Sequence, residues 1–190
     1  MILRAADRVA VPWRNGGGLT REVAAHPPHS DLGNFDWRVS LAEVRRGGPF
    51  SSFPGIDRHM ALISGGLELS IPGRDALSLS SDTAPLSFPG ELPVYAEPRS
   101  EPVTDLNVMT RRGRFVARLT RCRVTAPTQV RLEADATLVL ALTPLTLRAA
   151  SIDANLSALD AARFGAGTET LTVQWAVAAA GFWLIEIRTA

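Results

Sequence analysis

The sequence of 190 residues is poor in the residues that usually build metal centres and cross-links. It has a single cysteine, Cys122, and three histidines, His26, His29 and His59. One cysteine excludes an intrachain disulfide and a zinc site made of several thiolates. His26 and His29 flank two prolines, and no His-x-His pair occurs, whereas a histidine site needs two or three histidines with a carboxylate at set spacing. We therefore expect no metal ion.

Lysine is absent, and the charge is evenly balanced. All 20 cationic residues are arginine, they are scattered along the chain, and 19 acidic residues leave a net charge of +1. A nucleic-acid footprint needs clustered positive charge, so no nucleic-acid partner is expected. No apolar run approaches the length of a membrane span, and the first seven residues are too short and too polar for a signal peptide. These features predict a cytoplasmic protein without a membrane partner.

Common catalytic motifs are also missing. The sequence contains no Gly-x-Ser-x-Gly elbow, no Gly-x-x-x-x-Gly-Lys phosphate loop and no dinucleotide fingerprint. We therefore assign no catalytic residue and expect no cofactor.

Turn residues recur about every eight to twelve positions, which is typical of an all-β sandwich or barrel. Residues 35–44 alternate, with Phe35, Trp37, Val39 and Leu41 on one face. Further strands are expected at 58–64 and 67–71, joined by a hairpin at Gly65-Gly66. The pattern also predicts a short helical turn at 158–164 and a strand at 171–177.

The segment 12–22 places an indole, a guanidinium and an amide before three glycines, in the order Trp13-Arg14-Asn15-Gly16-Gly17-Gly18. Glycine runs are kept where the backbone needs positive φ or a close approach. The run has two interpretations. Its N–H groups face a small anion flanked by Arg14 and Asn15, or it is a tight loop in which Trp13 fills a core.

Arginines and amides stand on the polar faces of the expected strands. Arg38 shares its face with Ser40, Arg58 begins a strand, and Asn107 shares a face with Asp105 and Met109. A guanidinium suits bidentate recognition of a carboxylate. The alternative is that each arginine is neutralised by a carboxylate of the protein, from Asp57, Asp105 or Glu43.

Three segments together resemble the HutD/Ves family of bacterial cupin-like proteins. They are residues 12–22, residues 35–44 with 48–58, and residues 105–111. The resemblance implies a bicupin, with two cupin-like β-barrels or jelly-roll sheets in one chain. We place the boundary so that 1–110 is an N-terminal barrel carrying the site and 111–190 is a C-terminal barrel. It also implies a sensor or regulator linked to histidine utilisation, with urocanate, formiminoglutamate, formylglutamate or formate as ligands.

Our leading hypothesis is that the N-terminal barrel binds a small carboxylate. Arg38 and Arg58 pair with the anion, Asn15, Ser51 and Asn107 orient it, and aromatic rings shield it. The predicted ligand-binding residues are Trp13, Arg14, Asn15, Gly16, Gly17, Thr20, Arg38, Ser40, Phe50, Ser51, Phe53, Arg58, Asp105, Asn107 and Met109.

Two other hypotheses stay open at this point. One is a metal-independent cupin hydrolase or isomerase acting on a related intermediate, with Glu22, Glu43, Asp57 or His59 as acid–base groups. The other is a protein-interaction module in which the second barrel forms a homodimer.

Overall fold

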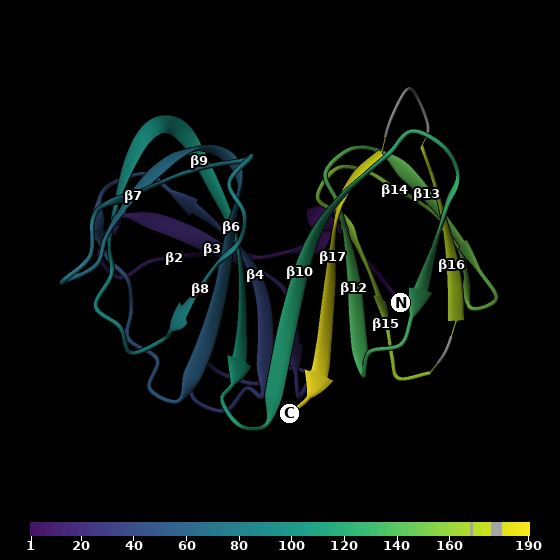
Figure 1. The fold of residues 1–190 in the computed structure, drawn as a ribbon, viewed down its shortest axis with the longest axis horizontal. Helices are drawn as coiled ribbons and strands as arrows, with labels where there is room; N and C mark the ends of the chain where they lie inside the picture. Colours follow the sequence, from purple (N-terminus) through teal and green to yellow (C-terminus); the bar gives the residue numbers. More distant parts are fainter. Residues whose placement is uncertain (168, 176–179) are drawn as a thin grey trace. The chain divides into compact units, whose positions relative to one another are not determined.

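The computed structural model describes residues 1–167, 169–175 and 180–190, without the side chains of Glu101, Trp175 and Ala180. The described residues form an all-β protein whose only helix is the short 3-10 helix η1 (Ala5–Asp7). In this part of the chain no helix is long and apolar enough to cross a membrane. The chain divides into two compact units, an N-terminal unit of Arg8–Phe115 and a C-terminal unit of Met1–Asp7 with Val116–Ala190 (Figure 1).

The N-terminal unit is one antiparallel sheet of eight strands. Six strands follow the order β2-β3-β4-β9-β6-β7, while β5 pairs with β9 and β8 pairs with β6. The strands are β2 (Ala10–Pro12), β3 (Gly18–His26), β4 (Trp37–Val44), β5 (Gly48–Pro49), β6 (Ile56–Ser70), β7 (Leu77–Ser80), β8 (Leu86–Pro89) and β9 (Tyr95–Arg111).

The long strands β6 and β9 pair along almost their whole length and form the middle of this sheet. Their register shifts three times between Leu62 and Leu67, around Gly65-Gly66. The expected hairpin at Gly65-Gly66 is therefore wrong, because these glycines lie inside one continuous strand. Gly65 has φ of +80°, and a Cβ there would lie 2.7 Å from Pro102 O, so the glycine lets the two strands approach at a bend rather than reversing the chain.

Strand register fixes which side chains share a face of the sheet. Met109 lies opposite both Arg58 of β6 and Arg38 of β4, and Asn107 lies opposite both Met60 and Ser40. Directly opposed residues of an antiparallel pair point to the same side. We call this side the inner face, formed by Arg38, Ser40, Ala42 and Val44 of β4, Arg58, Met60 and Leu62 of β6, and Val103, Asp105, Asn107 and Met109 of β9.

The inner face contributes to the apolar core of the N-terminal unit. Val44, Met60, Leu62 and Val103 belong to one buried cluster with side chains from β7 and β8. The predicted alternation is confirmed for Trp37, Val39 and Leu41, which lie on the opposite face and are all at least 95% buried. Phe35, predicted for the same face, precedes β4 and instead belongs to a buried cluster with Ile56 and Met109. Both faces of β4 are thus buried. Polar residues lie on both faces of the sheet, since Thr110 stands opposite Trp37 and His59 stands opposite Val108.

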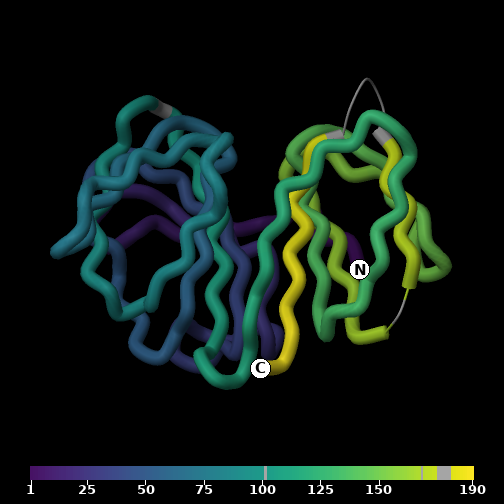
Figure 2. Tube along the Cα trace, viewed as in Figure 1, coloured from purple at the N-terminus to yellow at the C-terminus, as the bar shows by residue number. Residues whose placement is uncertain are grey.

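The C-terminal unit contains a five-stranded sheet, β1-β15-β12-β17-β10, and a four-stranded sheet, β11-β16-β13-β14. In Figure 2 the yellow strand β17 runs between β12 and β10. Buried aliphatic and aromatic side chains from both sheets make one apolar cluster. The strands are β1 (Ile2–Leu3), β10 (Phe115–Val124), β11 (Thr128–Leu132), β12 (Ala136–Ala141), β13 (Leu145–Ala149), β14 (Ile152–Leu156), β15 (Ala161–Phe164), β16 (Glu169–Trp175) and β17 (Ala180–Thr189).

Strands β15 and β16 lie where a helical turn and a strand were expected. The helical turn expected at 158–164 is wrong, since a turn closed by Asp160 N–H to Ser157 O leads directly into strand β15. The strand expected at 171–177 corresponds to β16 as far as Trp175, and residues 176 and 177 lie outside the described residues.

The observed division of the chain differs from a boundary at residue 110 in two places. Residues 111–115 cluster with the N-terminal unit, and the first seven residues cluster with the C-terminal unit. The second difference arises because Ile2 and Leu3 pair with Ala162 and Ala161 of β15.

Candidate functional site

Arg58 is the most unusual residue of the inner face, because its side chain is charged and its residue is only 5% exposed. Its guanidinium carbon lies 4.8 Å from the ring centroid of Phe50, 5.2 Å from that of Phe88 and 5.9 Å from that of Phe53. Ring faces attract a cation, so these three rings hold the guanidinium in place. Among the described residues, its Nε atom has no hydrogen-bond partner. A buried N–H donor is therefore left for another group.

Two polar residues of β9 share this face and are also buried. Asp105 is 2% exposed and Asn107 is 9% exposed. Within the part of the chain that the structure describes, neither Asp105 Oδ1 nor Asn107 Oδ1 has a hydrogen-bond partner. Three buried atoms of one sheet face thus lack partners, which marks the face as a candidate binding site.

Burial shifts the titration of both charged groups. It raises the pKa of the Asp105 carboxyl to about 7, against the opposing attraction of the Arg58 charge. Burial likewise lowers the pKa of Arg58 to about 10, and the charge of Asp105 opposes that shift. Arg58 stays cationic at neutral pH, whereas Asp105 changes charge near neutrality. Perturbed groups of this kind gather at functional sites.

Arg38 lies on the same face but has a partner. Its Nε donates to Glu22 Oε2 at 2.8 Å, and the arginine side chain is only 13% exposed. Arg38 is therefore neutralised by a carboxylate of the protein, which was one of the two alternatives from the sequence. Its partner is Glu22, whereas the carboxylates expected were Asp57, Asp105 and Glu43. Ser40, which follows Arg38 by two residues on β4 and shares its face, is buried.

The glycine turn is occupied by its own hydrogen bonds. Gly16 N–H donates to Trp13 O at 3.0 Å, and Gly17 N–H donates to Asn15 Oδ1 at 2.9 Å. A Cβ on Gly18 would lie 2.3 Å from Glu43 O and 3.1 Å from the Trp13 ring, so the third glycine permits close packing. Of the two interpretations of this run, the structure has the tight loop.

Trp13 links the glycine turn to the inner face. Its ring packs against the buried cluster of the N-terminal unit, and its Nε1 donates to Thr20 Oγ1 at 2.8 Å. Arg14 and Ser51, in contrast, are exposed. The structure thus brings Arg38, Ser40, Arg58, Asp105, Asn107 and Met109 onto one face, with Phe50 and Phe53 at Arg58.

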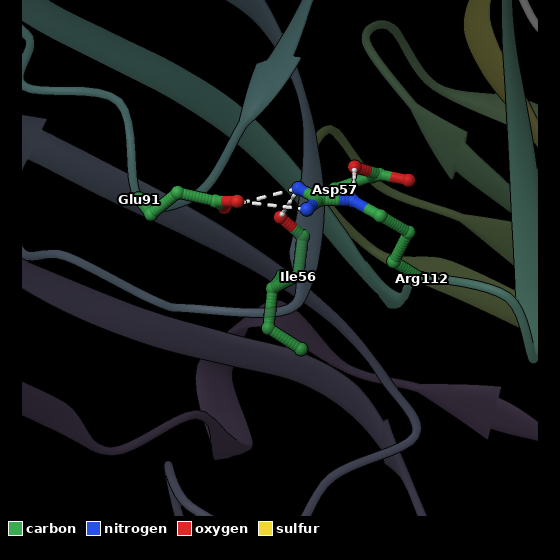
Figure 3. Close-up of polar contacts among 4 residues, drawn as sticks. All are labelled: Ile56, Asp57, Glu91 and Arg112. Atoms are coloured by element: carbon green, nitrogen blue, oxygen red, sulfur yellow. Dashed lines mark hydrogen bonds and ion pairs between the residues drawn. The ribbon is translucent and has the colours of Figure 1, made fainter.

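Arg112 fastens the backbone beside the buried arginine (Figure 3). Its two terminal nitrogens donate to Glu91 at 2.7 and 3.0 Å, its Nε donates to Asp57 Oδ1 at 2.7 Å, and one terminal nitrogen also donates to Ile56 O. The bonds from Arg112, with a backbone hydrogen bond of Glu91, lower the pKa of the Glu91 carboxyl to about 2. Arg112 therefore joins the start of β6 to the loop after β8, and these are the two strands that carry Arg58 and Phe88.

Phe88 and Glu22 are the site residues that the sequence did not predict as ligand-binding. Phe88 lies opposite Arg58 in the pairing of β8 with β6. A short strand before a Pro-Gly turn gives no sign of which strand it pairs with. The acid–base groups considered for an enzyme have other roles, because arginines bind Glu22, Glu43 and Asp57, and His59 Nδ1 lies 2.7 Å from Ser87 Oγ.

Comparison with solved structures defines the class of fold. The chain superposes on a cupin 2 conserved barrel domain protein from Leptotrichia buccalis with a TM-score of 0.62 at 12% identity, covering 90% of this chain and 89% of the other. At that identity the likeness concerns the fold alone. The protein is a cupin-like all-β protein, and its inner face bears a buried arginine among aromatic rings.

The family follows from closer relatives. A model of the HutD family matches residues 5–183, so the chain belongs to the HutD family. HutD from Pseudomonas fluorescens SBW25 is 28% identical with a TM-score of 0.84, covering 100% of this chain and 98% of that one. A conserved protein of unknown function from Pseudomonas aeruginosa PAO1 is 26% identical with a TM-score of 0.89, covering 99% and 98%.

Curated sequences agree over part of their length. Protein Ves of Citrobacter koseri is 38% identical over 109 residues, which are 56% of each chain. An uncharacterised protein encoded in the 3′ region of hutC in Pseudomonas putida is 34% identical over 119 residues, 62% of each. The chain thus matches somewhat more than half the length of these curated relatives. The resemblance to HutD and Ves that the sequence motifs indicate is confirmed.

Proposed function

We propose that this protein binds a small carboxylate at the inner face of its N-terminal unit, with Arg58 as the group that pairs with the anion. The observation that carries the proposal is a cation that is 95% buried, has an Nε without a hydrogen-bond partner, and is enclosed by three rings. Burying a charge is costly unless it is compensated. Ring faces compensate part of that cost, and a carboxylate adds charged hydrogen bonds.

The rest of the site supplies recognition. Asn107 and Ser40 lie beside the arginine on the inner face, and Phe50 and Phe53 shield it. Arg38 joins the anion only when the ligand displaces Glu22 from its ion pair, so Arg38 has a smaller role than Arg58. In this proposal each of the two units is a cupin barrel, and the anion binds in the first of them, because the interior of the C-terminal unit is apolar.

The proposed ligands are carboxylates of histidine breakdown, namely urocanate, formylglutamate and formate. Support for this choice comes from relatives, because one is encoded beside hutC and another is HutD, whose structure is described for a formate condition. The proposed role is a sensor or regulator, and the ordered ion pairs of the carboxylates considered as acid–base groups favour binding over turnover.

Titration calorimetry with urocanate, formylglutamate, formate and histidine tests the proposal. Arg58→Met keeps an apolar side chain and removes the charge. The binding free energy of the carboxylate should therefore weaken by about 1.5–3 kcal/mol. Arg131→Met, which removes an exposed arginine of the C-terminal unit, is the matched control and should leave affinity unchanged. Equal affinity in a folded Arg58→Met variant would contradict the proposal.

A further inference from the structure

The hydrogen-bonding groups of the inner face do not match a simple carboxylate. A carboxylate accepts hydrogen bonds, so it satisfies the donor at Arg58 Nε. Asp105 Oδ1 and Asn107 Oδ1 are acceptors, and in the described part of the chain both lack a partner. A ligand without donors would leave both acceptors unmet, at about 1–3 kcal/mol for each buried group. The site therefore contains more acceptors than its proposed anion uses.

The donor and the acceptors occupy different positions along the sheet. Arg58 stands opposite Met109, Asn107 follows two residues along β9, and Asp105 two residues beyond that. At a rise of about 3.3 Å per residue, the row of Asp105 is about 13 Å from the row of Arg58 along the strand. The two charges nevertheless interact, since each opposes the pKa shift of the other. The inner face thus has a cationic end and an acceptor end.

We propose that Asp105 and Asn107 select ligands that carry an N–H or O–H donor in addition to the carboxylate. This inference rests on the proposed function, because it assumes that the carboxylate binds at Arg58. The selected ligand is bifunctional, such as an N-acyl amino acid or an imidazole carboxylate, and simple carboxylates are disfavoured.

Charge supports the same conclusion. The groups that face Asp105 on the inner face are Ala42 and Ser40 of β4, Leu62 and Met60 of β6 and Asn107 of β9, all uncharged. The other charged groups of this face are Arg58, the ion pair Arg38–Glu22 and Arg111, which stands opposite Ile56 and pairs with Asp36. Asp105, when ionised, opposes the charge of Arg58, and it repels the carboxylate of a ligand bound there. A donor placed on Asp105 offsets the repulsion, because it supplies a charge-assisted hydrogen bond.

Two pairs of probes isolate the donor. N-Formylglycine is compared with N-formylsarcosine, in which a methyl group replaces the hydrogen of the amide N–H. Urocanate is compared with 3-phenylacrylate, which lacks the ring N–H. Affinities are measured by calorimetry at pH 8, where Asp105 is ionised. We expect the N–H member of at least one pair to bind tenfold more tightly or better. We expect Asp105→Leu to reduce that ratio to about two and to tighten binding of the member without the donor.

Two further variants separate recognition from structure. Asp105→Asn keeps the shape and removes the charge, so it should also tighten binding of the member without the donor, even where Asp105→Leu folds poorly. Asp75→Asn removes the charge of an exposed aspartate of the same unit and should leave the ratio unchanged. A purely structural role of Asp105 would instead weaken both members of a pair equally.

The two proposals fail in different ways. When no carboxylate of either pair binds the unchanged protein, the proposed function itself is contradicted. When carboxylates bind and Arg58→Met weakens them, but both ratios stay near one or are insensitive to the Asp105 variants, the donor selection is overturned and the carboxylate site stands.

Discussion

At the scale of single residues, Arg58 and Asp105 determine the properties of the site. Both are buried on the inner face, and each shifts in pKa mainly because burial disfavours its charged form. Their mutual attraction opposes both shifts but does not cancel them. A protein that needed only a stable core would place apolar residues at these positions, because a buried pair of charges contributes little to stability. Because a stable core does not need such a pair, we propose that it serves ligand binding.

Asp105 makes the stability of the protein depend on pH. Its pKa is raised from 3.8 to about 7 in the folded state, so between these values the folded protein binds more protons than the unfolded chain. The free energy of unfolding therefore falls as pH rises through this window. Asp105→Asn removes this pH dependence. The free energy of unfolding of the variant minus that of the unchanged protein should therefore be about 2–4 kcal/mol larger at pH 8 than at pH 4.

Urea unfolding at pH 4, 6 and 8 measures this difference. Asp75→Asn, an exposed aspartate of the same unit, provides the control and should show no trend. A difference between Asp105→Asn and the unchanged protein that is flat across the three pH values would show that the carboxyl titrates normally in the folded state.

Much of the candidate site could be predicted at this scale, because successive side chains of a strand point alternately to its two faces. Alternation alone put Asp105, Asn107 and Met109 on one face, and the register confirms it. The same rule separated Arg38 and Ser40 from Trp37. Glu22 and Phe88 were not predicted, because their contacts depend on which strands pair and in what register. Neither property is written in the local pattern of one strand.

At the scale of elements, β6 and β9 are the strands on which the site is built. The sequence predicted two strands with a hairpin at Gly65-Gly66, since two glycines between alternating segments are a strong turn signal. In the structure strand β6 continues through these glycines. Glycine is needed at position 65 because a Cβ there would meet Pro102 O and Val103 Cα. Local sequence does not distinguish a glycine that reverses the chain from one that bends it.

Gly65→Ala should therefore destabilise the N-terminal unit through two effects. A positive φ costs a residue with a Cβ about 1–2 kcal/mol, and the clash with backbone adds to this. Gly55→Ala is a matched control, because Gly55 has a similar φ of +74° with nothing within 4 Å of the added Cβ. We expect Gly65→Ala to lose at least about 1 kcal/mol more than Gly55→Ala in urea unfolding, and equal losses would contradict the packing described at the bend.

At the scale of the whole molecule, the first seven residues belong with the C-terminal unit. Asp160, which is 5% exposed, accepts hydrogen bonds from Ala5 N–H, Ser157 N–H and the Arg4 guanidinium. No local pattern predicts this arrangement, because Arg4 and Ala5 are more than 150 positions from Asp160. A boundary drawn from motifs alone therefore assigned these residues to the first half.

Asp160→Asn should weaken the attachment of this segment. Burial raises the pKa of Asp160, but the hydrogen bonds from Ala5, Arg4 and Ser157 outweigh it and leave the pKa lowered. The stabilisation is present above the unfolded value near 3.8 and is lost as pH falls through the folded value. At pH 7 we expect a loss of about 1–3 kcal/mol. Asp153→Asn, whose side chain is 74% exposed, should lose less than about 0.5 kcal/mol, and equal losses would contradict this role.

Binding of a carboxylate at Arg58 is tested most directly by a crystal structure of the complex with the tightest-binding carboxylate. We predict a carboxylate oxygen about 2.7–2.9 Å from a guanidinium nitrogen of Arg58, with the rings of Phe50, Phe53 and Phe88 still around it. A carboxylate bound elsewhere, at the glycine turn or in the C-terminal unit, with Arg58 enclosed by its rings alone, would contradict it.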